Sequence, residues 1–344
     1  MTSSTGNIEP WDPHAASDDD LRALYAFSCE LEAELDPQTP VEPFELWRKS
    51  LLVTTPFHET KRWVARDGDE VVGYGSLELN RTDDNRHRAD FNVDVAQSRR
   101  REGIGRRVVA AILDAAEADG RVSLTAGTHK DSVGEAFLQS IGCEHAYLDR
   151  RSRLLVNDVD RTLVDGWVAD AKAKASDYSL LLFDGPVPDE HLQATIEIHE
   201  TMNDAPREGL DLEDEHETPE QFRDGERRLA ERGTVRMQLI ARHDPTGQFA
   251  GFTTLSWHPL MPQLVWQWGT AVRREHRGHA IGRWIKAANF ANLLERNPEA
   301  EFIDTWNAGS NKWMLAINDD LGFKPYIWYT AWQAKIADIR KAIA

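Results

Sequence analysis

The stretch TAVRREHRGHAIGRWIK, residues 270–286, places small residues at Gly278, Ala280 and Gly282 with basic residues on both sides. An apolar periodicity typical of a helix begins there. A similar stretch, SRRREGIGRRVV, spans residues 98–109. We therefore predict a strand, a tight turn and a helix at two places in the chain.

The two stretches belong to a longer internal repeat. Three further pairs of segments recur at a nearly constant separation: VVGYGSLEL (71–79) and FAGFTTLSW (249–257), VSLTAGT (122–128) and FIDTWNA (302–308), IGC (141–143) and LGF (321–323). The repeat predicts two mixed α/β domains in tandem. We expect a first domain over residues 1–158, a connecting helix over 159–177 and a second domain over 178–344.

Local patterns support this order of elements. Apolar and polar residues alternate from Ala89 to Val95, which predicts a half-buried strand, and the apolar residues after Ile104 recur at helical spacing. Ser17 followed by Asp20 predicts a capping box at the start of a helix. YIWYTAW, residues 326–332, alternates as a buried strand would.

Composition excludes several functions. The formal net charge is −18 with no basic block, so we expect no nucleic-acid partner. Two cysteines are too few for a disulfide framework or a zinc site, and we expect no metal. We expect neither a signal peptide nor a membrane span, and hence a cytoplasmic protein.

The two turns are suited to an anion. Small residues let the backbone approach a ligand, and the first N–H groups of the helix carry the positive end of its dipole. Such a site holds phosphate or pyrophosphate, and neighbouring arginines add charge-assisted contacts. An ordinary tight turn with solvated arginines is the alternative. GxxxxGK[ST] does not occur, which excludes a P-loop, and no GxGxxG opens a βαβ unit.

Both turns resemble the acyl-CoA signature of the GNAT superfamily of N-acetyltransferases, Arg/Gln-x-x-Gly-x-Gly/Ala. Arg100 to Gly105 fits fully, whereas Arg277 to Gly282 has Ala280 at the first glycine. The segment DTWNAGSNKWMLAINDDLGF, residues 304–323, is similar to tandem members of the family found in actinobacteria. The resemblance implies two GNAT-like domains, each a mixed, mostly antiparallel sheet flanked by helices.

The resemblance also implies acetyl-CoA as the acyl donor. Its pantetheine is expected to lie between two splayed strands, paired to backbone groups of one of them. The cofactor-binding residues that follow are Val93, Val95, Arg100, Arg101, Gly103, Ile104, Gly105 and Arg106 in the first half, and Thr270, Val272, Arg277, Gly278, His279, Ala280, Ile281, Gly282, Arg283, Asn307 and Asn311 in the second. For either asparagine, a role as a cap or turn residue is the alternative.

The catalytic residues are less clear from the pattern. The family often has a tyrosine acid where this chain has Leu138 in the first half and Asn318 in the second, and neither can donate a proton as an acid. Tyr326 is a substitute, with core packing as its alternative. Glu200 is a candidate base, and a solvated surface carboxylate is its alternative. We nevertheless expect the second half to be catalytic.

The expected activity is direct transfer of an acetyl group from acetyl-CoA to the amine of a small molecule in a ternary complex, by a monomer or homodimer. The acidic run from Leu210 to Gln221 suggests attraction of an amine-bearing acceptor, although a solvated loop is the ordinary interpretation. Two alternatives remain: a non-catalytic acyl-CoA-binding or sensing protein, and turns that only close the fold.

Overall fold

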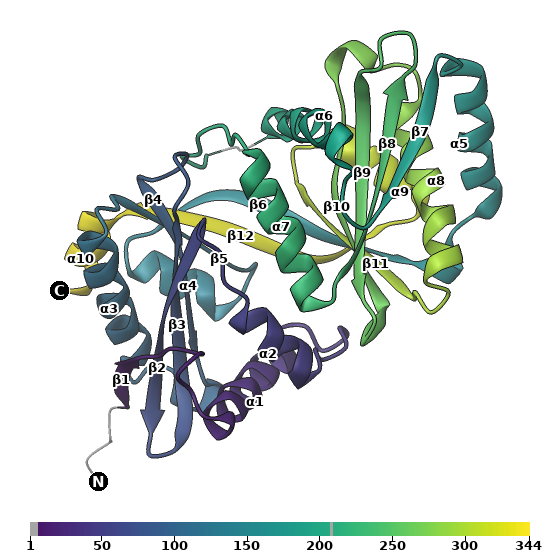
Figure 1. The fold of residues 1–344 in the computed structure, drawn as a ribbon. Coiled ribbons are helices and arrows are strands. Elements are labelled where there is room, and N and C mark those ends of the chain that lie inside the picture. Colours follow the sequence, from purple (N-terminus) through teal and green to yellow (C-terminus); the bar gives the residue numbers. More distant parts are fainter. Residues whose placement is uncertain (1–5, 207–208) are drawn as a thin grey trace. The chain divides into compact units, whose positions relative to one another are not determined.

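The computed structural model describes residues 6–206 and 209–344, which form two compact units. The first unit contains residues up to 148 with 209–213 and 329–344, and the second contains 149–206 and 214–328. This division differs from the expected boundary near residue 158. Two long strands, residues 144–155 and 324–335, each pass from one unit into the other. In both units a mixed sheet carries helices on both faces (Figure 1).

Two strands are shared between the units. Strand β6 (Glu144–Leu155) begins in the first unit, and its residues 149–155 pair with β11 of the second. Strand β12 (Lys324–Lys335) begins in the second unit, and its residues 329–335 pair with β5 of the first. The second half of β6 therefore lies in the sheet of the other unit. Because β6 and β12 are equivalent in the repeat, each sheet is completed by the strand from the other half of the chain, as in domain swapping.

The sheet of the first unit has the order β1-β2-β3-β4-β5-β12, antiparallel except for the parallel pair β4 and β5. Its other elements are β1 (Asn7–Pro10), α1 (Asp18–Leu35), α2 (Phe44–Leu52), β2 (His58–Asp67), β3 (Glu70–Asn80), β4 (Arg88–Val95), α3 (Ile104–Ala118), β5 (Ser123–His129), α4 (Val133–Ser140) and α10 (Ile336–Ile343). The sheet of the second unit has the equivalent order β7-β8-β9-β10-β11-β6, with β10 and β11 parallel.

The second unit repeats the first element by element, as expected. Its elements are α5 (Arg161–Lys174), β7 (Tyr178–Asp184), α6 (Asp189–His199), α7 (Pro219–Arg232), β8 (Val235–His243), β9 (Phe249–His258), β10 (Met261–Val272), α8 (Ile281–Arg296), β11 (Phe302–Ala308) and α9 (Lys312–Leu321). The predicted capping box is confirmed, since the backbone N–H of Asp20 donates to Ser17 Oγ at 3.1 Å.

The core positions the turn helices against the sheets. In the first unit, α3 packs Ile104, Val108 and Ile112 on one face, and α1 packs Leu24 and Phe27 on the other. In the second unit, α8 occupies the place of α3, while α6 and α7 cover the opposite face. Burial of these apolar side chains holds each turn at the end of its strand.

Candidate active site

In each unit, the parallel strands separate after a short paired stretch. Strand β4 pairs with β5 only from Arg88 to Asp90, and β10 pairs with β11 only from Leu264 to Gln267. Past these points, β4 continues along β3, and β10 continues along β9 after a register shift. The parallel strands of each unit therefore leave an opening beyond their paired stretch, where the resemblance implied two splayed strands.

Backbone polarity shows which residues face each opening. The N–H of Ala96 donates to Val72 on β3, at 3.0 Å, and that of Arg273 donates to Ala250 on β9, at 2.9 Å. Because successive residues of a strand direct their N–H and C=O groups to opposite sides, those of Val95 and Val272 point away from β3 and β9. The same alternation applies to Val93 and Thr270, which are two residues earlier. These are the four backbone positions assigned to the acyl-CoA pantetheine.

Both turns enter their helices through a left-handed residue without a side-chain cap. Gly103 has φ 80° before α3, and Ala280 has φ 61° before α8. Glycine adopts this conformation freely, whereas alanine does so at a cost of about 1 kcal/mol. The first N–H groups of α3 and α8, including those of Ile104 and Ile281, lack a capping side chain in the described structure, which makes each helix start a candidate anion site.

The first arginine of each motif has the same anchor. Arg100 Nε donates to the carbonyl of Val95 at 3.2 Å, and Arg277 Nε donates to that of Val272 at 3.1 Å. Each arginine thereby ties its turn to the last residue of the strand.

The two guanidinium groups differ in their other partners and in their exposure to solvent. Arg100 makes two further hydrogen bonds, at 2.7 and 2.6 Å, to Glu34 of α1. This pairing lowers the pKa of Glu34. The Arg277 side chain is 56% exposed and lies 3.7 Å from Asp204. The second turn therefore has the more accessible guanidinium.

The remaining turn residues are mostly at the surface. Arg101 and Gly278 are exposed with positive φ. Arg106 donates to the Ser140 carbonyl at 3.4 Å and Arg283 to Asp320 at 2.6 Å, while His279 Nδ1 lies 3.2 Å from the Lys174 carbonyl. Gly105 and Gly282 follow in the first helical turn, where a Cβ on Gly105 would meet Phe137 at 3.2 Å.

The candidate catalytic residues of the second unit lie in different surroundings. Asn318 is fully buried, and Glu200 is exposed with an oxygen 3.3 Å from His216 Nδ1. The Tyr326 ring lies 3.9 Å from the guanidinium carbon of Arg153. The structure does not record a contact among the three described side chains. Asn311 caps α9, accepting from the Met314 N–H at 3.3 Å, which is the role the alternative gave it.

A buried polar chain runs behind the second opening. Lys286 Nζ of α8 donates to Asn318 Oδ1 at 2.8 Å, and Asn318 Nδ2 donates to Asn307 Oδ1 of β11 at 2.7 Å. Burial lowers the pKa of Lys286 to about 7. Sequence reasoning missed Lys286, although a lysine within an otherwise apolar helix face was a visible signal.

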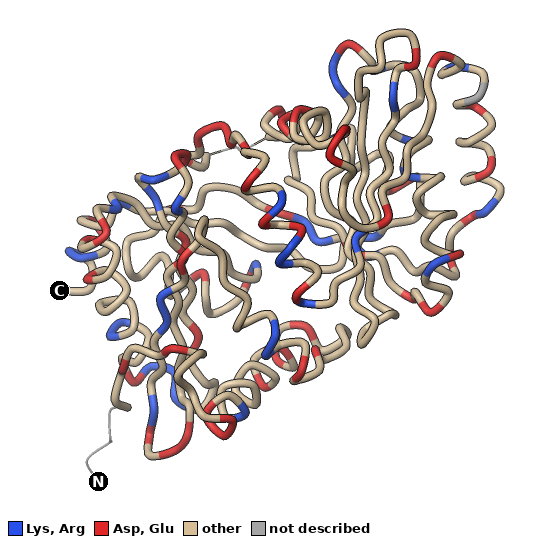
Figure 2. Tube along the Cα trace, in the orientation of Figure 1, with Lys and Arg blue, Asp and Glu red and all other residues tan. Residues whose placement is uncertain are grey.

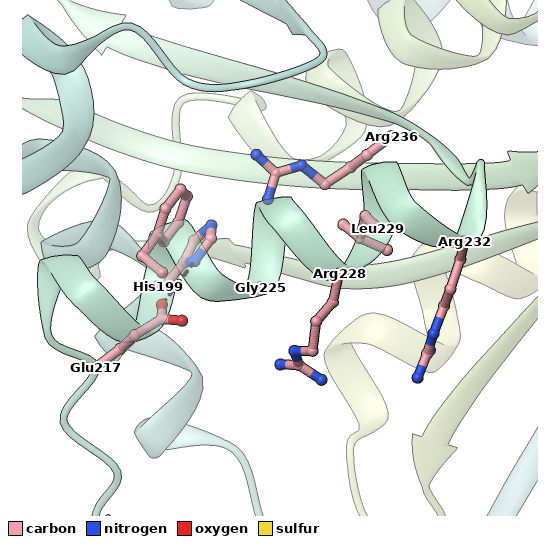
Figure 3. Close-up of a pocket in the computed structure, with 8 residues that line it drawn as sticks. His199, Glu217, Gly225, Arg228, Leu229, Arg232 and Arg236 are labelled. Atoms are coloured by element: carbon pink, nitrogen blue, oxygen red, sulfur yellow. Dashed lines mark ion pairs between the residues drawn. The ribbon is translucent and has the colours of Figure 1, made fainter. Parts of the chain in front are cut away.

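A pocket of about 240 Å³ lies on the face of the second unit that carries α6 and α7 (Figure 3). Among its lining residues, His199 Nδ1 lies 3.9 Å from the Glu217 carboxylate, and Arg228 and Arg232 project from α7. The His199 ring is 4.6 Å from that of Phe252, whose strand neighbour on β10 is Ala271. One lining residue of the pocket thus contacts strand β9, the antiparallel neighbour of β10. His199 was not among the predicted residues.

The acidic run is divided between the two units. Glu213 belongs to the first unit, where its carboxylate accepts from the Asn85 N–H at 2.5 Å, and the residues from Asp214 onward belong to the second. Acidic and basic residues are interspersed along the trace (Figure 2). Within the described residues, no three His, Cys, Asp or Glu side chains gather as a metal site, and none of the helices has the length and apolarity needed to cross a membrane.

Comparisons with known proteins agree with this geometry. Residues 21–142 match the profile of the Acetyltransferase (GNAT) family. A solved tandem GNAT protein from the clavulanic acid biosynthesis pathway is similar over 96% of this chain and 98% of its own, with 29% identity and a TM-score of 0.80. The comparison with curated proteins gave no match.

A second solved structure, a GCN5-related N-acetyltransferase from Sphaerobacter thermophilus, covers 98% of this chain and 97% of its own at 16% identity and a TM-score of 0.68. That likeness supports the fold alone. The family profile matches the half with the full glycine motif, and the half with Ala280 is matched through structure.

Proposed function

Because residues 21–142 match the GNAT acetyltransferase family and the whole chain is similar to a tandem GNAT protein, we propose that its second unit transfers an acetyl group from acetyl-CoA to the amine of a small molecule. The observation that carries this proposal is the opening between β10 and β11, which ends at the turn of Arg277 and the uncapped start of α8. The exposed Arg277 guanidinium supports the choice of unit, because Arg100 is already paired with Glu34.

Acetyl-CoA would be held by this chain's residues in three ways. The N–H groups at the start of α8 and the side chains of Arg277 and Arg283 suit its pyrophosphate. The backbone of Thr270 and Val272 suits the amides of its pantetheine. When bound, acetyl-CoA supplies the activated acyl group.

The proposed reaction is direct. The neutral amine nitrogen bonds to the thioester carbonyl carbon, the carbon–sulfur bond breaks, the amine loses a proton to a base, and the coenzyme A thiolate gains one. We assign the base role to Glu200, which lies next to His199 at the end of α6, and proton donation to Tyr326. Asn318 orients the side chain of Asn307 through its hydrogen bonds with Lys286 and Asn307.

The pocket beside His199 is the proposed acceptor site. Glu217 suits the amine, and Arg228 and Arg232 suit an anionic group elsewhere on the acceptor. Met202 of the segment after α6 supports this location, since a Cβ added to Gly269 of β10 would lie 3.4 Å from its sulfur.

Calorimetric titration with acetyl-CoA tests the proposal. We expect Gly282→Glu to abolish binding, because its carboxylate would occupy the anion site, while Gly282→Ala retains binding, since its Cβ would make only ordinary contact with Ile317 at 3.5 Å. Gly105→Glu is the corresponding variant of the first unit and should leave binding to the second unchanged. Loss of binding only in Gly105→Glu would move the activity to the first unit.

One observation favours a different role for the first unit. It keeps the turn and the opening, but the positions equivalent to the polar chain are the apolar or small residues Val109, Leu138 and Gly127. This unit is a candidate for binding acyl-CoA without catalysis. Acetyl-CoA binding that survives Gly282→Glu, without thioester cleavage on addition of amines, would support that role.

A further inference from the structure

Three side chains from three elements of the second unit form one hydrogen-bonded chain: Lys286, Asn318 and Asn307. The two distances are 2.8 and 2.7 Å. Lys286 is 3% exposed and Asn318 is fully buried, whereas Asn307 is partly exposed. The chain therefore leads from the interior beneath α8 to the surface of β11.

The hydrogen bond at the buried end sets the direction of this chain. Lys286 donates to the oxygen of the Asn318 amide, as a protonated lysine, which has only donors, must do. The NH₂ group of Asn318 must then point the other way, where it donates to the oxygen of Asn307. The group of Asn307 that remains for another partner is its own NH₂.

Asn307 lies past the point where the two parallel strands separate. The last residues of β10 and β11 that pair are Gln267 and Thr305, so Asn307 is two residues into the opening. Thr270 and Val272 border the same opening from β10. A donor at Asn307 is therefore on the wall opposite the backbone groups assigned to acyl-CoA.

The polar chain is not needed to pack this fold. At the equivalent places the first unit has Val109, Leu138 and Gly127, and the first two are buried in its apolar core. Burial of a lysine amine is costly, and the only cause of its lowered pKa is loss of solvent. Polar groups at two positions that are apolar core in the first unit, linked to a third on the strand, indicate a role beyond packing.

We propose that Lys286 is a positioning residue that acts through Asn318 to hold the Asn307 amide with its NH₂ group, and not its oxygen, available to acyl-CoA in the opening between β10 and β11. The proposal rests on the function proposed above. Asn307 is the residue that would touch acyl-CoA, and the other two determine which end of its amide does so.

Asn318→Asp is the decisive variant. Its carboxylate keeps the size of the amide and accepts from Lys286, but it also accepts from Asn307 and so turns the Asn307 amide around. We expect the Kd for acetyl-CoA to rise about tenfold, the equivalent of one lost hydrogen bond of roughly 1.4 kcal/mol. In an Asn307→Ala background, Asn318→Asp should not change the Kd further, because no amide remains to be turned. A structural defect would lower affinity in both backgrounds.

A measurement without acyl-CoA gives an independent readout. In the free protein, the NMR signal of the Lys286 side chain should titrate near pH 7 and shift to higher pH in Asn318→Asp, because the new carboxylate stabilises the charged amine. Titration of the wild-type lysine at its ordinary pH, near 10, would overturn the buried relay.

The outcomes separate this inference from the proposed function. Tight binding of acetyl-CoA by wild type and equally tight binding by Asn318→Asp would overturn the relay and leave the acetyltransferase proposal standing. No binding by wild type would overturn both. If adding Lys286→Met to Asn318→Asp restored the wild-type Kd for acetyl-CoA, the proposal would also be contradicted. The loss of affinity would then come from the charge of the lysine and not from the orientation of the Asn307 amide.

Discussion

Arg100 and Glu34 are joined by two side-chain hydrogen bonds of 2.7 and 2.6 Å, which fasten helix α1 to the first turn. The corresponding arginine of the second unit, Arg277, meets the carboxylate of Asp204 only at 3.7 Å. The same motif residue thus stabilises the fold in one unit and remains accessible to a ligand in the other.

Glu34→Gln should lower the free energy of unfolding at pH 7 by about 0.5–1 kcal/mol, the range for a bidentate pair screened by solvent. Arg100 lowers the pKa of Glu34, so its contribution is present above the ordinary carboxyl pKa and is lost as pH falls through the lowered value. Urea unfolding at pH 7 and at pH 3 measures the loss of unfolding free energy caused by Glu34→Gln. Glu30→Gln, on the exposed side of α1, is the control. Equal losses at the two pH values would contradict the assignment.

Gly75→Ala should destabilise the first unit by roughly 2–4 kcal/mol, because a Cβ there would lie 2.3 Å from a methyl group of Val108 on α3. The close approach of α3 to β3 depends on this glycine. Gly166→Ala is the matched control: its Cβ would meet no atom within 4 Å inside helix α5, so we expect a gain of about 0.5–1 kcal/mol. Thermal unfolding of both variants compares them, and a neutral Gly75→Ala would show that α3 can move away from β3.

Lys286→Met combined with Asn318→Leu should stabilise the second unit, by on the order of 3 kcal/mol near pH 6. Burial lowers the pKa of Lys286 to about 7, so between pH 7 and 10 the unfolded chain binds the extra proton. Wild-type stability therefore rises over this range relative to the variant, and the difference between the two proteins narrows. Chemical unfolding of both proteins at pH 6, 8 and 10 would show whether the difference in their unfolding free energies narrows. A constant difference would mean that the amine is not buried.

Acidification should loosen the second turn through His276. Nδ1 of this buried ring lies 2.9 Å from the Tyr178 hydroxyl oxygen, and its Nε2 lies 3.0 Å from the side-chain oxygen of Gln248. Burial, followed by the nearby His243, lowers the pKa of His276, with Arg273 and His279 acting in the same direction and Glu275 opposing. Its contribution to stability is thus lost as pH falls below about 6.5.

His276→Gln should remove part of this acid sensitivity. The expected result is that unfolding free energies of wild type and variant, measured between pH 7.5 and 5, converge toward the acid end. His258→Gln is a suitable control because His258 lies at the far end of β9 and bonds to the Arg232 carbonyl. Parallel pH curves for wild type and His276→Gln would show that another group is responsible.

Short-range patterns predicted most of the elements. The alternation from Ala89 to Val95 and the periodicity after Ile104 became β4 and α3, and FIDTWNA became β11 with the same bounds. Such patterns depend only on neighbours within a strand or helical turn. The opening between β10 and β11 followed from resemblance, since neither strand's own residues show where their pairing ends.

The sequence by itself determined that one domain is present twice, with an anion-suited turn in each copy, because glycine conformation, helix starts and apolar periodicity are local properties of the chain. Tertiary structure alone decided that β6 and β12 exchange sheets, that Arg100 is paired while Arg277 is accessible, and that Lys286 is buried against Asn318. Each of these three features depends on a contact between residues far apart in the chain. Local sequence patterns cannot predict such contacts, because the equivalent strand or side chain in the other half has nearly the same neighbours in sequence.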